Sequence, residues 1–103
     1  MTKKYEFTGE TKIVGGVTLK RIRALVAIMV SGVAAGDLGG WIETESNLSQ
    51  VYGNAWVYGN ARVYGDARVY GDARVYGNAW VYGDARVYGD ARVYGDARVY
   101  GDA

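Results

Sequence analysis

The chain contains no cysteine, no histidine and no proline. Without cysteine it forms no disulfide and offers no thiolate to a metal. Without histidine it lacks the commonest general base and the commonest metal-binding side chain. The sequence therefore predicts no catalytic residue, no metal site and no cofactor.

An excess of charge of one sign is also missing. Twelve Lys and Arg stand against eleven Asp and Glu, which leaves a net charge of +1. A nucleic-acid-binding domain needs a basic excess on one face, so no nucleic-acid partner is expected. The apolar stretch at residues 24–35 is shorter than the ~20 residues that span a bilayer, so no membrane partner is expected. The polar start of the chain lacks the apolar run of a secretion signal.

Glycine and tyrosine, in contrast, are abundant, at 16 and 10 residues. From Val51 onwards the six-residue word Val-Tyr-Gly-Asp/Asn-Ala-Arg/Trp occurs eight times in full and then once without its last residue. A helix is excluded, because Gly, Asp and Asn are poor helix formers and a period of six keeps no helical face. The residues Ala-Arg-Val-Tyr alternate as in a short strand, with Ala and Val on one face. Gly-Asp and Gly-Asn are turn dipeptides.

Two arrangements of strand and turn fit this word. A series of hairpins would leave one face of the sheet open. A solenoid with three words per coil buries every Val and Ala in one interior and explains why all words have the same length. We therefore predict a β-solenoid in which residues eighteen apart in the sequence stack at ~4.8 Å.

The word also carries a family resemblance. An aliphatic first position, as at Val57, and a small fifth position, as at Ala61, resemble the hexapeptide repeat of left-handed parallel β-helices. The resemblance covers residues 49–103, with Ser49 in a small position, and implies a left-handed coil. Enzymes with this fold include acyltransferases and sugar-nucleotide enzymes, which generally use a catalytic histidine and long loops between coils. This chain has neither, so the resemblance implies no enzymatic activity.

A second resemblance comes from the first half of the chain. The segments TLKRIRAL (residues 18–25) and GDLGGWIETESNLSQ (residues 36–50), followed by YGNAWVYGNA, are similar to small bacterial and prophage-encoded proteins with YGDA/YGNA-type repeats. This resemblance implies a fold and a prophage setting, without an activity. The expected location is the cytoplasm or a phage particle.

The chain is thus predicted to be all-β, with a β-rich capping region at residues 1–48 and a solenoid of about three 18-residue coils at residues 49–103. Strand-like segments occur at residues 4–8, 11–14 and 17–28, with Gly15-Gly16 as a turn signal. Four large apolar side chains are expected to plug the core before the first word: Leu38, Trp41, Ile42 and Leu48.

Stacking at eighteen residues also arranges the outward side chains in columns. Each tryptophan of the repeat replaces an arginine, so its ring can lie against a guanidinium in the same column, a contact worth ~0.5–1 kcal/mol. Cross-strand aromatic pairs of this kind stabilise a sheet by themselves. The alternative interpretation is a surface that binds a glycan or a phage or host surface, and its side chains would be Tyr58, Tyr76, Tyr94, Trp56, Trp80, Arg62 and Arg98.

The last coil carries the main functional prediction. An uncovered coil presents unpaired backbone groups and an open Val/Ala core, which is a template for another chain. We predict a non-enzymatic structural protein that associates with itself, as a tail-to-tail homodimer or, if the cap is permissive, as a filament. The predicted contact residues are Val99, Tyr100, Gly101, Asp102 and Ala103.

Overall fold

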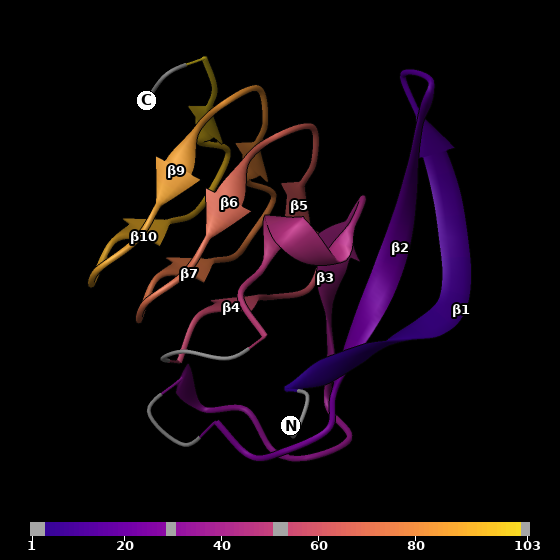
Figure 1. Cartoon of the computed structure of the whole chain (residues 1–103), viewed down its shortest axis with the longest axis vertical. Coiled ribbons are helices and arrows are strands. Elements are labelled where there is room, and N and C mark those ends of the chain that lie inside the picture. The colour runs from indigo at the N-terminus through magenta and orange to yellow at the C-terminus, as the bar shows by residue number, and fades with distance from the viewer. Residues whose placement is uncertain (1–3, 29–30, 51–53, 102–103) are drawn as a thin grey trace.

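The computed structural model describes residues 4–28, 31–50 and 54–101. Its described elements are eleven strands and one short 3-10 helix, η2 (Glu45–Asn47), as predicted for an all-β chain. Figure 1 shows a long hairpin on one side and a stack of coils that leads away from it toward the C-terminus.

The hairpin consists of β1 (Tyr5–Val14) and β2 (Val17–Ala24), which pair antiparallel. The turn between them is the predicted one: Gly15 and Gly16 have φ angles of 56° and 83°. Positive φ at both central residues is what a type I′ hairpin turn requires. The segments predicted at residues 4–8 and 11–14 belong to the single strand β1, and the strand predicted at residues 17–28 is too long, because the chain leaves the hairpin after Ala24.

Strand β3 (Leu38–Ile42) connects the two halves of the molecule. It pairs antiparallel with β2 on one side and parallel with β5 (Arg62–Val63) on the other. Beyond β5 follow β8 (Trp80–Val81) and β11 (Arg98–Val99), so one six-stranded sheet has the order β1-β2-β3-β5-β8-β11. The hairpin therefore extends one side of the solenoid.

The repeats form a solenoid of about three coils, as predicted. A second side contains β4 (Trp56–Val57), β7 (Arg74–Val75) and β10 (Arg92–Val93), and a third contains β6 (Arg68–Val69) and β9 (Arg86–Val87). All these pairs are parallel and join residues eighteen apart.

Each corner of a coil is a tight turn. In the word that begins at Val57, the N–H of Ala61 donates to the carbonyl of Tyr58 at 3.0 Å, and Gly59 between them has a φ of 53°. Glycine takes this left-handed conformation without the steric cost that a Cβ would bring. The repeat therefore places glycine at the first central residue of every described corner turn.

The core is a column of inward Val and Ala side chains that β3 and the following loop continue. Ile42 lies in register with Val63, and Leu48 forms a parallel bridge with Val69; both Ile42 and Leu48 are fully buried. They plug the core as predicted. Leu38 does not, since it lies at the start of β3 and is 47% exposed. Trp41 does not either, since it lies in register with Arg62, on the outward face of the sheet.

The predicted register of Ser49 is also wrong. Its N–H donates to the carbonyl of Val69 at 2.9 Å, which is the bond that Tyr70 makes with Val87 one coil later. Ser49 thus holds the tyrosine position of the word and not the small position. The reason is that Leu48 and Val57, which fill the valine position on two successive sides of the coil, stand nine residues apart instead of the usual six.

Candidate functional site at the open edge of the last coil

The last described coil, β9 to β11, has a backbone edge that no described strand covers. In the coil before it, Arg74 donates its N–H to Ala91 at 3.0 Å and Tyr76 donates to Val93 at 2.9 Å. The equivalent N–H groups of the last coil find no acceptor among the described residues. They belong to Tyr88, Asp90, Arg92, Tyr94, Asp96, Arg98 and Tyr100. Such a row of unpaired groups is a ready template for another chain.

The hydrophobic interior opens at the same edge. Val75 and Val81 of the inner coils are fully buried, whereas Val93 is 9% exposed and Val99 is half-buried. Of the predicted contact residues, Val99, Tyr100 and Gly101 lie here. Asp102 and Ala103 lie outside the described residues.

Outward tyrosine rings stack face to face along the coils. The ring centre of Tyr82 lies 5.2 Å from those of Tyr64 and Tyr100, at interplanar angles of 4° and 10°. The ring centres of Tyr76 and Tyr94 lie 5.3 Å apart, at an interplanar angle of 11°. Burial, together with the neighbouring Tyr82, raises the pKa of the Tyr64 phenol above its usual value. Inner rings such as Tyr82 therefore have a neighbouring ring against the face that points toward the C-terminal edge, whereas the described rings of the last coil have none there.

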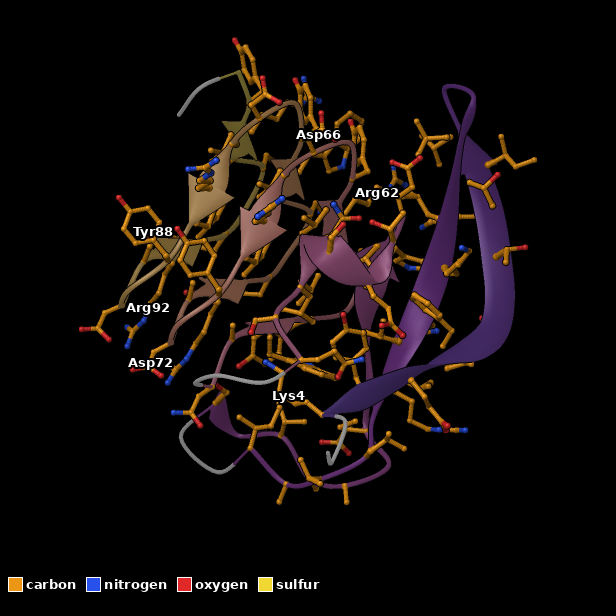
Figure 2. All side chains as sticks on the ribbon, viewed as in Figure 1. Lys4, Arg62, Asp66, Asp72, Tyr88 and Arg92 are labelled. Carbon is orange, nitrogen blue, oxygen red and sulfur yellow. The ribbon has the colours of Figure 1, made fainter. Side chains whose placement is uncertain are left out.

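Three tyrosines belong to the last coil: Tyr88, Tyr94 and Tyr100, which are 57%, 57% and 59% exposed. Figure 2 shows the Tyr88 and Arg92 side chains projecting outward from the coils. The predicted ladder of Tyr58, Tyr76 and Tyr94 forms with one irregularity. Tyr58 meets Tyr76 edge-on at 82°, and its hydroxyl donates to the Ser31 carbonyl at 2.6 Å.

Cations and tryptophan rings alternate along the sheet that contains β3. The guanidinium carbons of Arg62 and Arg98 lie 5.0 and 4.7 Å from the Trp80 ring centre. Trp41, in register with Arg62, continues this column, and the Lys12 ammonium lies 4.2 Å from its ring. Burial, followed by the charges of Arg62 and Arg21, lowers the pKa of Lys12. Sequence reasoning missed Trp41 in this role, although Trp41-Ile42 has the Trp-Val pattern of the repeat.

Trp56 does not belong to a surface ladder, and the prediction that placed it there is wrong. The side chain is 1% exposed, and its ring meets Tyr5 edge-on at 6.2 Å. The ammonium of Lys4 donates to the carbonyl of the adjacent Ala55 at 2.7 Å. The start of β1 covers this part of the first coil, which the repeat pattern alone could not indicate.

The opposite end of the solenoid is closed by side chains of the first half. Asn47 is fully buried, and its amide nitrogen donates to the carbonyls of Gly65 at 3.1 Å and Ala67 at 2.8 Å. Its amide oxygen accepts from the N–H groups of Glu43 and Thr44. Asn47 thus occupies acceptors that a further coil would use. Sequence reasoning missed it, because a lone Asn in a polar loop gives no signal of burial.

Two further observations limit the chemistry of the described residues. A groove of about 510 Å³ beside η2 is lined by Ser46, Ser49, Arg68, Val69, Tyr70, Gly71 and Arg86. These lining residues include two guanidiniums and three hydroxyls but no carboxylate. Among the described residues no cluster of Asp and Glu is suited to hold a metal, and no helix is long and apolar enough to cross a membrane.

The repeats match a known family model. Five overlapping stretches agree with the family model of the YdcK Beta solenoid repeat, at residues 49–65, 55–71, 67–83, 79–94 and 91–103. Together they cover more than half of the chain. No curated protein matches it.

Proposed function

Because the chain belongs to the YdcK Beta solenoid repeat family, we propose that it is a structural, non-enzymatic protein that associates with itself through the open edge of its last coil. The observation that carries this proposal is the row of N–H groups from Tyr88 to Tyr100 that find no acceptor among the described residues, beside the partly exposed Val93 and Val99. Addition of strands from a second chain would satisfy these groups and bury the open end of the core.

The difference between the two ends of the solenoid favours a closed dimer over a filament. Asn47 and Lys4 already occupy backbone acceptors at the first coil, and the hairpin extends one side of it. A head-to-tail filament needs a free acceptor edge at that end. A tail-to-tail dimer uses the same open edge in both copies and leaves both capped ends outside.

The two sequence resemblances add the handedness of the coil and the biological setting to this proposal. The hexapeptide pattern supports a left-handed coil, and the similarity to prophage-encoded repeat proteins supports a role in the cytoplasm or in a phage particle.

The alternative is a binding module for a glycan or a phage or host surface, built from the Tyr, Arg and Trp columns. The stacking geometry weakens this alternative, because the faces of inner rings such as Tyr82 and Trp80 already lie against neighbours in their columns. Glycan binding that is lost on Tyr76→Ala, in a protein that remains folded, would favour it over self-association.

Proline at the edge tests the proposal. The Arg92 N–H has no acceptor among the described residues, so Arg92→Pro removes an edge donor without breaking a described hydrogen bond of the monomer. Arg92→Ala is the matched control, because it removes the same side chain and keeps the N–H. In sedimentation velocity we expect Arg92→Pro to dimerise at least about tenfold more weakly than Arg92→Ala, which corresponds to ~1.4 kcal/mol. Equal dimerisation of the two variants would contradict a role for the backbone edge.

A further inference from the structure

We propose that the groove beside η2 binds the phosphate group of a small phosphate monoester between the guanidiniums of Arg68 and Arg86. This inference goes beyond the proposed self-association and does not depend on it. Three features of the described residues lead to it: the origin of the groove, the surroundings of its two arginines, and the chemistry of the side chains that line it.

The groove arises where a side chain of the first half turns inward. Leu48 forms a parallel bridge with Val69, so Asn47, one residue earlier, stands at the register position of Arg68. In the coils that follow, the residue at this position is an outward arginine. Asn47 is instead fully buried and donates to two backbone carbonyls of the coil. It therefore does not fill the outward space next to Arg68, and the groove between η2 and β6 opens there (Figure 1).

The size of the groove suits a small molecule. Its volume of about 510 Å³ lies within the range of small-molecule sites, ~300–1,000 Å³. Ser46 and Ser49 line it from the side of η2. The Ser46 hydroxyl lies 2.9 Å from that of Thr44, and it can accept a hydrogen bond from Thr44 while it donates one to a ligand. The groove can thus hold a phosphate together with a small organic group.

The two arginines of the groove repel each other without compensation from the described residues. Arg68 stands directly opposite Arg86 in the parallel pair of β6 and β9, whose strands are ~4.8 Å apart. Both residues are exposed, and neither forms a hydrogen bond or an ion pair with a described residue. Like charges directly opposite each other destabilise a strand pair. An anion bound between the two guanidiniums would offset this repulsion.

The other two sides of the solenoid supply such compensation from the chain itself. On the side of β5, β8 and β11, a tryptophan ring separates the arginines. On the side of β7 and β10, Arg74 stands opposite Arg92, as in the groove. The pocket that these two arginines share is also lined by the carboxylates of Asp72 and Asp90 (Figure 2). Arg68 and Arg86 have neither a ring nor a carboxylate of this kind beside them in the groove.

The lining favours a phosphate over other anions. A phosphate monoester carries a charge of roughly −1.5 to −2 at pH 7, which two guanidiniums match, whereas a carboxylate or a sulfate ester carries a single charge. Each guanidinium is a planar fork that donates two parallel N–H groups to phosphate oxygens. The carboxylates nearest along the chain, those of Glu45, Asp66 and Asp84, do not line the groove. A dianion therefore meets donors and no competing negative charge.

Calorimetric titration of the dilute full chain with phenyl phosphate at neutral pH and constant ionic strength tests this site. We expect saturable binding that Arg68→Gln and Arg86→Gln each weaken at least about tenfold, because each substitution removes a charge-assisted pair of hydrogen bonds. Arg92→Gln is the matched control. It removes the same charge from another arginine that stands opposite an arginine, but beside carboxylates, and should change the affinity less than about twofold.

Thermal unfolding distinguishes lost binding from lost structure. Neither Arg68→Gln nor Arg86→Gln should lower the melting temperature, since each removes one member of a repulsive pair. Absence of saturable binding by the unmodified chain, or an equal loss of affinity in Arg92→Gln, would overturn the site. Phenyl sulfate is the second ligand to titrate: if it binds as tightly as phenyl phosphate, the assignment of a phosphate group is wrong.

Discussion

Single residues account for the difference between the two ends of the coil stack. At the first coil, Asn47 and Lys4 donate side-chain hydrogen bonds to backbone carbonyls, and both residues are buried. At the last coil, Arg92 and Tyr94 leave their N–H groups without an acceptor among the described residues. Polar side chains of the first half thus replace a coil at one end only.

Asn47 provides the first prediction at this scale. Asn47→Asp keeps the shape and the acceptor oxygen but replaces both donated hydrogen bonds by a charge that faces the carbonyls of Gly65 and Ala67. We expect the free energy of unfolding to fall by about 2–4 kcal/mol in urea titrations of dilute protein. Asn60→Asp is the control, because Asn60 is an exposed corner residue and most other words have Asp there; its effect should stay within ~0.5 kcal/mol. Similar effects of the two substitutions would mean that Asn47 does not close the coil.

Lys4 gives the stability a pH dependence. Burial lowers its pKa from 10.5 to about 8, so between these values the folded state has lost a proton that the unfolded state keeps. Since the unfolded state then binds more protons, stability rises with pH across this window. We expect the wild type to gain on the order of 1–2 kcal/mol, relative to Lys4→Met, between about pH 7 and about pH 9.5. The comparison ends below pH 10, where tyrosines of the unfolded chain ionise. A gain of the same size in Lys4→Met would rule out Lys4 as its source.

At the scale of elements, the spacing between coils depends on columns of stacked glycines. Gly71 has a φ of 70°, and a Cβ added there would lie 2.9 Å from the nitrogen of Gly89 in the next coil. Gly89 has a similar φ of 63° but meets nothing within 4 Å, because no described coil follows it. The two positions share the backbone conformation and differ in what lies above them.

Substituting these two glycines separately distinguishes the cost of backbone strain from the cost of steric contact between coils. We expect Gly89→Ala to cost about 1 kcal/mol, since alanine must adopt a left-handed conformation. Gly71→Ala should cost a further 1–3 kcal/mol, approximately, because the coils must move apart to admit the methyl group. Urea titrations at low concentration, where the chain is monomeric, measure both. If both substitutions lowered the free energy of unfolding equally, the coils would not pack as closely as described.

How far the sequence predicts these elements depends on whether their partners are close along the chain or remote. The six-residue word predicted the strands, the corner glycines and the eighteen-residue stacking, because inside the stack each word meets words of the same pattern above and below it. Trp56, Leu38 and Ser49 were placed wrongly, because their environment is set by the non-repeating half. Tyr5 packs on Trp56 although the two residues are 51 positions apart in the sequence, and no local pattern predicts that contact.

At the scale of the whole molecule, the two ends of the described solenoid differ. Residues of the first half cover the first coil, whereas the N–H groups of Arg92 and Tyr94 in the last described coil find no acceptor among the described residues. The central claim is that this edge meets the same edge of a second copy.

Sedimentation equilibrium of the unmodified chain over a wide concentration series tests this claim most directly. The mass of one chain is 11.2 kDa, and we predict that the measured mass rises with concentration to a plateau at about twice this value. A mass that stays at that of one chain at the highest concentration would contradict self-association. A mass that rises without a plateau would contradict the closed dimer.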